Sequence, residues 1–212
     1  MIPVKICGIK TIKDAETAVI YGAKAIGFIF FKKSPRFITI NHAAFIANSL
    51  PKSIKKIGVF VNSRQDVINS IIKKVNLDLI QLHGNEPNEF CNFFDIPVIK
   101  AFQVKSLKDL HKIELYKNIS AILLDNHDEN LYGGTGKSFD WKLLDKVKFN
   151  YPIILSGGLK PSNINDAITL VNPNAVDINS GVENSPGIKS SAKIKSLFDK
   201  LLITKTTGYC FE

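Results

Sequence analysis

Short apolar runs rich in β-branched and aromatic residues recur along this chain of 212 residues, with helical patterns between them. Eight such runs occupy residues 3–7, 25–30, 56–61, 77–82, 97–102, 120–124, 151–155 and 175–178. Strands that alternate with helices are typical of a parallel sheet, because each return to the same edge needs a crossover. Eight units of roughly 26 residues match a compact eightfold parallel barrel.

The first helical segment has the clearest ends. Thr11 is expected to cap its N-terminus, Asp14 follows three residues later, and Gly22 ends it. Pro87 and Pro161 are suited to the first turns of two later helices. The other helices are predicted near residues 41–50, 64–75, 87–94, 106–117, 140–148, 161–171 and 189–203.

An open, doubly wound sheet fits the sequence less well than a barrel. Such a sheet usually has fewer strands and a Gly-x-Gly-x-x-Gly turn after the first, whereas the first turn here reads "CGIKT". No linker or composition shift marks a second domain. We therefore predict an α/β chain folded as one (β/α)8 TIM barrel over residues 1–212, with 204–212 as a C-terminal tail.

Composition excludes several classes of protein. No apolar run approaches the roughly 18 residues of a membrane span, and the N-terminal residues lack a signal-peptide pattern, so we expect a cytoplasmic location. Three cysteines at unrelated spacings predict neither a disulfide framework nor a zinc cluster. The net charge of +9 comes from scattered lysines, which favours a solvated surface or weak steering of an anionic small molecule over nucleic-acid binding.

Polar, glycine-rich and reactive residues follow the predicted strands. Each has an ordinary structural interpretation when taken alone, such as a packed cysteine or a turn aspartate. In an eightfold barrel, however, the carboxyl ends of all strands share one rim, where the chemistry takes place. The candidates are Cys7, Arg36, His83, Asp125, Gly157, Gly158, Asp177, Ser180 and Gly181.

The two glycine turns that follow the seventh and eighth strands predict a phosphorylated substrate. The loops at these positions are the usual phosphate site of the barrel, and glycine lets backbone N–H groups approach an anion closely. The turns read "LSGGL" at 155–159 and "NSGVE" at 179–183.

Cys7 and Asp125 follow strands on different parts of the rim, so they could face each other across the mouth. A thiol and a carboxyl without a metal-ligand cluster favour proton transfer over hydrolysis, with no metal or cofactor expected. The thiol would need nearby cations to lower its pKa, and the carboxyl would need burial to raise its own. Nucleophilic cysteine chemistry with His83 as the partner remains an alternative.

The motifs together resemble the phosphoribosylanthranilate isomerase family of tryptophan biosynthesis. They are spread over nearly the whole chain: "KICGI" (5–9), "GFIF" with "SPR" (27–36), "GVFV" (58–61), "QLHG" (81–84), "LLD" with "GGTGKSFDW" (123–141), "LSGGL" (155–159) and "VDINSGVE" with "PG" (176–187). The resemblance implies a cofactor-free eightfold barrel, either monomeric or homodimeric. It would catalyse the Amadori rearrangement of N-(5-phosphoribosyl)anthranilate to 1-(o-carboxyphenylamino)-1-deoxyribulose 5-phosphate.

The resemblance also implies roles for the candidate residues. Asp125 would be the general acid and Cys7 the general base, while Arg36 would hold the anthranilate carboxylate. The phosphate-binding turns correspond to Gly157, Gly158, Ser180 and Gly181. Asp177 and His83 occupy matching positions, but the resemblance assigns them no definite role.

The chain departs from the family pattern at three places. Asn179 replaces a serine in the last turn, Ser190 replaces a helix-capping aspartate, and the C-terminal "TKTTGYCFE" has no counterpart. Serine caps helices as well as aspartate does, so Ser190 should cost little. Two alternative functions remain: the histidine-pathway isomerase, which pairs two aspartates and shows a half-barrel repeat, and a non-catalytic phosphate-binding barrel.

Overall fold

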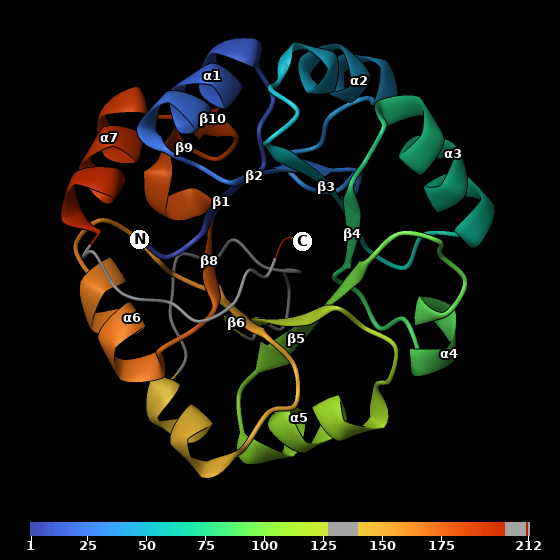
Figure 1. The fold of residues 1–212 in the computed structure, drawn as a ribbon, viewed down its shortest axis with the longest axis vertical. Coiled ribbons are helices and arrows are strands. Elements are labelled where there is room, and N and C mark those ends of the chain that lie inside the picture. The colour runs from blue at the N-terminus through green and yellow to red at the C-terminus, as the bar shows by residue number, and fades with distance from the viewer. Residues whose placement is uncertain (127–139, 202–210, 212) are drawn as a thin grey trace.

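The computed structural model describes residues 1–126, 140–201 and 211. Eight parallel strands form a closed barrel in the order β1 to β8, and β1 pairs with β8 to complete the ring (Figure 1). All eight predicted strands are confirmed, and no end is shifted by more than two residues. They are β1 (Val4–Cys7), β2 (Ala25–Ile29), β3 (Lys55–Phe60), β4 (Leu79–Leu82), β5 (Val98–Val104), β6 (Ala121–Asn126), β7 (Ile153–Leu155) and β8 (Ala175–Ile178).

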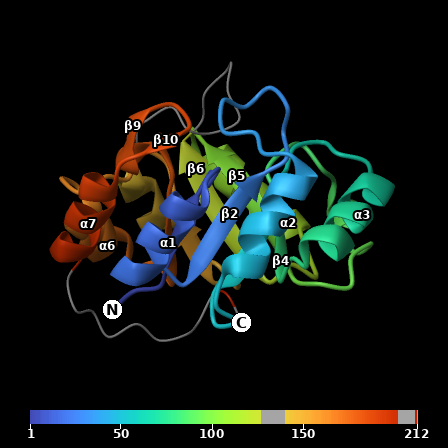
Figure 2. The ribbon, with the colours of Figure 1, turned by 90° about the horizontal axis from the view of Figure 1, so that it is seen from above.

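Helices surround the barrel and cover the outer face of its strands (Figures 1 and 2). They are α1 (Ile12–Tyr21), α2 (Ile40–Ser49), α3 (Gln65–Val75), α4 (Asn88–Cys91), α5 (Leu107–His111), α6 (Ile164–Val171) and α7 (Ser191–Lys200). Thr11 caps α1 by accepting the Asp14 N–H at 3.1 Å, as predicted. Ser190 likewise caps α7, because its hydroxyl accepts the Lys193 N–H at 3.3 Å.

Three predicted helices are shorter or tighter than expected. Residues 87–94 contain only the single turn α4, and turns and bends follow it up to Pro97 and β5. The segment 106–117 divides into α5 and the 3₁₀ helix η1 (Lys112–Leu115), and 140–148 forms the 3₁₀ helix η2 (Trp141–Lys146). Short connecting segments often adopt 3₁₀ geometry.

Side chains alternate between the two faces of each strand, and this gives the molecule two cores. One core lies between the strands and the helices. The other fills the inside of the barrel with residues Ala25, Ile57, Leu79, Ile99, Ala101, Ala121, Leu123, Ile154, Ala175 and Phe211. Phe211 is 2% exposed and is the one described residue of the predicted C-terminal tail.

The interior becomes polar towards the carboxyl ends of the strands. Lys5, Gln81 and Asp177 are buried in the barrel, and the loops beyond them form one rim. A short hairpin of β9 (Glu183–Ser185) and β10 (Ile188–Lys189) lies on that rim (Figure 2). No helix in the described ranges is long and apolar enough to cross a membrane.

Candidate active site

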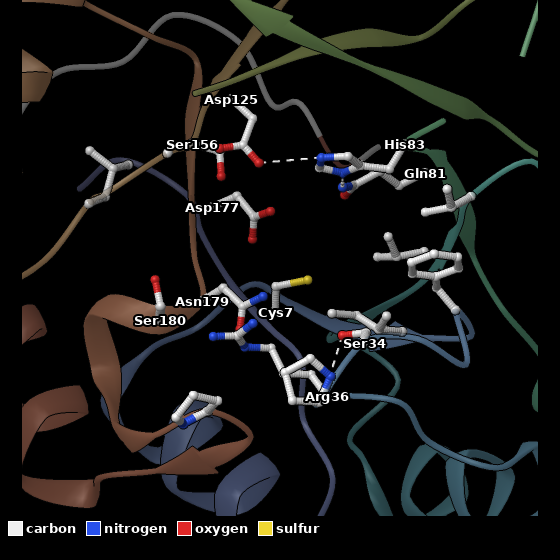
Figure 3. A pocket seen from close by; sticks show the side chains of 18 of the residues that line it. Cys7, Ser34, Arg36, Gln81, His83, Asp125, Ser156, Asp177, Asn179 and Ser180 are labelled. Carbon is white, nitrogen blue, oxygen red and sulfur yellow. Dashed lines mark hydrogen bonds and ion pairs between the residues drawn. The ribbon is translucent and has the colours of Figure 1, made fainter. Parts of the chain in front are cut away.

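A pocket opens at the rim where the strands end (Figure 3). Eight of the nine residues that the sequence predicts for the site line it, and they come from loops far apart in the chain. They are Cys7, Arg36, His83, Asp125, Gly157, Gly158, Asp177 and Ser180. The ninth residue, Gly181, packs against the Leu159 carbonyl, where any side chain would overlap the backbone. Its small size therefore lets the turn after β8 lie against the turn after β7.

Cys7 is the last residue of β1 and is 3% exposed. Gly27 on the neighbouring strand leaves room for its sulfur, because a Cβ at Gly27 would lie 2.7 Å from Sγ. Burial raises the pKa of the Cys7 thiol, although Lys5 and Lys189 act to lower it. The cations expected to lower this pKa are therefore present, but the effect of burial is larger.

Lys5 lies on the same strand face as Cys7 and is fully buried. Its ammonium forms an ion pair with Asp177 Oδ2 at 2.8 Å and donates to Gln81 Oε1 at 2.9 Å. Burial alone would lower the pKa of Lys5, but Asp177 and Cys7 raise it overall. Lys5 was not among the residues predicted for the site. The sequence did contain a signal for it: Lys5 lies two residues before Cys7 in an apolar strand, so the two side chains point to the same face.

Asp125 lies near the end of β6 and is 4% exposed. Its Oδ1 accepts the Asn126 N–H at 2.8 Å, and its Oδ2 lies 3.3 Å from His83 Nε2 (Figure 3). Gln81 Nε2 contacts the other ring nitrogen of His83 at 2.8 Å. His83 thus faces Asp125 and Gln81, whereas the charged groups that act on Cys7 are Lys5, Asp177 and Lys189. This arrangement disfavours a Cys–His nucleophilic pair.

Arg36 is buried at the opposite side of the pocket from Asp125 (Figure 3). Glu183 accepts its Nε–H at 2.9 Å and an Nη2–H at 2.7 Å, and Lys189 also contacts Glu183 at 2.9 Å. Burial opposes ionisation of Glu183, but the hydrogen bonds from Arg36 and the charge of Lys189 hold its pKa below the ordinary value. Glu183 and Lys189 were also missed, although Glu183 directly follows the last glycine turn.

The glycine turn after β7 has a backbone conformation that favours glycine. Gly157 and Gly158 follow β7 with φ of 81° and 67°, values that favour glycine. Gly157 also lies close to the catalytic candidates, because a Cβ there would lie 2.9 Å from Asp125 Oδ1. Ser180 begins the short 3₁₀ helix η3 (Ser180–Val182) after β8. The neighbouring "GGTGKSF" motif, residues 133–139, lies outside the described residues.

Metal-binding clusters are absent from the part of the chain that the structure describes. There, no group of three or more histidine, cysteine, aspartate or glutamate residues could hold an ion. The pocket instead brings together a buried thiol, a buried carboxyl, two positive-φ glycines and a guanidinium. An eightfold barrel with these groups at its rim defines the class of barrel enzymes that move protons on phosphorylated substrates.

Comparison with known proteins identifies the family within that class. The family model of N-(5'phosphoribosyl)anthranilate (PRA) isomerase matches residues 4–200. The chain is 44% identical over 200 residues to N-(5'-phosphoribosyl)anthranilate isomerase of Geotalea uraniireducens, covering 94% of this chain and 98% of that one. It is 45% identical over 195 residues to the Geobacter sulfurreducens enzyme, covering 92% and 96%. The chain belongs to the phosphoribosylanthranilate isomerase family, and it is an isomerase.

Solved structures agree with this assignment. The structure of phosphoribosyl anthranilate isomerase from Thermotoga maritima has a TM-score of 0.86 and 39% identity, covering 94% of this chain and 98% of that one. A phosphoribosyl anthranilate isomerase in complex with reduced 1-(o-carboxyphenylamino)-1-deoxyribulose 5-phosphate has a TM-score of 0.83, with the same identity and coverage.

Proposed function

We propose that this chain catalyses the Amadori rearrangement of N-(5-phosphoribosyl)anthranilate to 1-(o-carboxyphenylamino)-1-deoxyribulose 5-phosphate in tryptophan biosynthesis. The observation that carries the proposal is a buried thiol, Cys7, and a buried carboxyl, Asp125, in one pocket beside the glycine turns. A similar enzyme, 39% identical to this chain, binds a reduced form of the product. Family membership supports the same reaction here.

Asp125 acts as the general acid in this proposal. It protonates the ring oxygen of the ribose, and the C1–O bond breaks to leave an open-chain Schiff base with the anthranilate nitrogen. Asn126 N–H holds Oδ1 at 2.8 Å, which leaves Oδ2 on the His83 side of the carboxyl. A carboxyl fixed at one oxygen presents its proton in a defined direction, as general acid catalysis requires.

Cys7 acts as the general base. Its thiolate removes the proton from C2 of the sugar, and the electron pair moves to the Schiff-base nitrogen to give an enolamine. The enolamine then tautomerises to the ketone. Burial raises the pKa of the Cys7 thiol, whereas the positive charges of Lys5 and Lys189 act to lower it and so favour the thiolate form that serves as the base.

The two ends of the substrate bind at different sides of the pocket. The glycine turns at Gly157–Gly158 and Ser180–Gly181 receive the phosphate, since backbone donors bind anions without a dedicated cation. Arg36 receives the anthranilate carboxylate. Its guanidinium has five N–H donors, and Glu183 takes only two of them, so the remaining Nη1 and Nη2 donors can form a second fork.

Asp177 is suited to orient the sugar. Lys5 occupies its Oδ2, whereas its buried Oδ1 accepts no hydrogen bond from the described residues. A buried carboxylate oxygen without a donor is costly, and a sugar hydroxyl would supply one. This supports a substrate-binding role for Asp177, which the resemblance left open.

The test is the fluorescence of the anthranilate group. Purified protein should cause a loss of substrate fluorescence without added metal or nucleotide, and the product should have the substrate's mass. Heat-inactivated protein and the histidine-pathway ribonucleotide serve as controls. Unchanged fluorescence with the anthranilate substrate, or turnover of the histidine-pathway compound alone, would reject the proposed reaction.

The proposal extends to a cytoplasmic protein that acts as a monomer or homodimer, without nucleic-acid or membrane partners. The Thermotoga maritima enzyme is described as dimeric and has also been generated as monomers. Light scattering of the purified chain will give its mass. A larger assembly would contradict the proposed oligomeric state.

A further inference from the structure

A chain of buried hydrogen bonds crosses the barrel, and three of its members, Gln81, His83 and Asp177, line the pocket. Lys5 Nζ donates to Asp177 Oδ2 at 2.8 Å and to Gln81 Oε1 at 2.9 Å, and Gln81 Nε2 lies 2.8 Å from His83 Nδ1. The exposed fractions are 0% for Lys5, 1% for Gln81, 4% for Asp177 and 8% for His83. Donors and acceptors in this chain must therefore match one another, because little water is available to compensate a mismatch.

Lys5 determines the direction of the Gln81 amide. An ammonium group has three donors and no acceptor, so the amide oxygen must face it. The amide NH₂ then faces His83 Nδ1. The opposite orientation would place two donors against each other at Lys5 in a buried site, and that arrangement is costly.

The Gln81 amide in turn determines the protonation of His83. An NH₂ group can only donate, so Nδ1 of His83 must accept and carries no proton. A neutral imidazole with a bare Nδ1 has its proton on Nε2. That nitrogen is buried, forms no hydrogen bond with the described residues, and lies 3.3 Å from Asp125 Oδ2 (Figure 3).

We propose that Lys5 and Gln81 are positioning residues that hold His83 as the neutral Nε2–H tautomer, so that an Nε2–H, 3.3 Å from Asp125 Oδ2, faces the carboxyl and His83 cannot take its proton. A bare Nε2 would accept the proton that Asp125 must deliver to the ring oxygen. An imidazolium would pair with the ionised carboxylate and keep Asp125 from being protonated. Only the Nε2–H tautomer leaves the proton of the Asp125 carboxyl for the substrate.

The inference rests on the proposed acid role of Asp125, but its first test does not require activity. Long-range ¹H–¹⁵N correlation spectra of the free protein report which imidazole nitrogen carries the proton. The sequence contains four histidines, and the His83 signals are assigned by their loss in His83→Gln. We expect His83 in the Nε2–H form near neutral pH. An Nδ1–H tautomer or an imidazolium would overturn the inference and leave the assignment of the reaction to the fluorescence assay.

The second test replaces the group that donates to His83 Nδ1 with one that can only accept. In Gln81→Glu, one carboxylate oxygen can keep the Lys5 contact while the other faces Nδ1, so the proton should move to Nδ1. We expect kcat to fall by at least about tenfold with KM little changed, because acid catalysis and not binding is impaired. Gln65→Glu makes the same chemical change at an exposed position of α3 and should alter neither the His83 spectrum nor kcat.

Gln81→Met keeps the test decisive if Gln81→Glu does not fold. Methionine fills a similar volume and donates nothing to Nδ1, so His83 should lose its single tautomer and kcat should fall. A variant at position 81 that changes the His83 tautomer but keeps wild-type kcat would refute the positioning role. Loss of kcat with an unchanged His83 spectrum would refute it as well.

Discussion

Replacing Gly27 would move the thiol of Cys7, the proposed base, without changing its chemistry. It pairs with Cys7 on the neighbouring strand, and a Cβ at this position would lie 2.7 Å from Cys7 Sγ and 3.1 Å from Lys5 Cε. Heavy atoms pack at about 3.5–4.0 Å, so Gly27→Ala should displace the thiol by about 1 Å. Misplacing a catalytic group by about 1 Å can lower the rate of reaction by about 100-fold. We expect kcat/KM to fall by this factor in the fluorescence assay.

Gly58→Ala is the matched control. Its Cβ would lie 2.5 Å from Leu77 Cδ1 and 2.8 Å from Phe60 Cε2, on the outer face of the neighbouring strand β3. Both variants should lose about 1–3 kcal/mol of unfolding free energy from overpacking, measured by urea denaturation. Only Gly27→Ala should lose activity. Wild-type kcat/KM in Gly27→Ala, or an equal loss in both variants, would show that the position of the thiol does not limit the reaction.

Three further predictions concern other parts of the molecule. Phe211→Ala should lower the unfolding free energy by about 3–5 kcal/mol, because it empties the lower barrel interior; unchanged urea unfolding would contradict this packing. Arg36→Met should raise KM about 10- to 100-fold and leave inhibition by inorganic phosphate unchanged. In this variant Glu183 keeps its ion pair with Lys189 and is not left without a charged partner. If phosphate inhibition is lost too, Arg36 belongs to the phosphate site. Activity should survive exhaustive EDTA treatment, and a loss restored by one divalent ion would favour a metal-using barrel.

The alternation of strands and helices was sufficient to predict the barrel. Parallel strands need crossover helices between them, and eight parallel strands can close into a ring. The helices after β4 and β6 were harder to predict. Their sequences contain apolar residues at helical spacing, but the first forms a single α turn at Asn88–Cys91 and the second a 3₁₀ helix at Trp141–Lys146. Tertiary geometry overrides local propensity in such connections.

The residues on the rim were predicted for the same reason as the fold, since strand ends meet at one edge. The charged partners of two of them, Lys5 beside Asp177 and Glu183 beside Arg36, were not predicted. Lys5 and Asp177 are 172 positions apart, and Arg36 and Glu183 are 147 apart. These pairs depend on the register between strands and loops, which periodicity along one strand does not reveal. The strand register places Lys5 beside Asp177 once the barrel closes.

The central claim is that Cys7 is the base and Asp125 the acid, and the most direct measurement is the turnover of Cys7→Ser and Asp125→Asn. Serine keeps the size of the side chain but ionises far less readily, and asparagine has no acid proton to deliver. Each variant should fold and bind inorganic phosphate like the wild type, with kcat reduced at least about 100-fold. If either variant keeps near-wild-type kcat in the fluorescence assay, that residue has no part in the proton transfers.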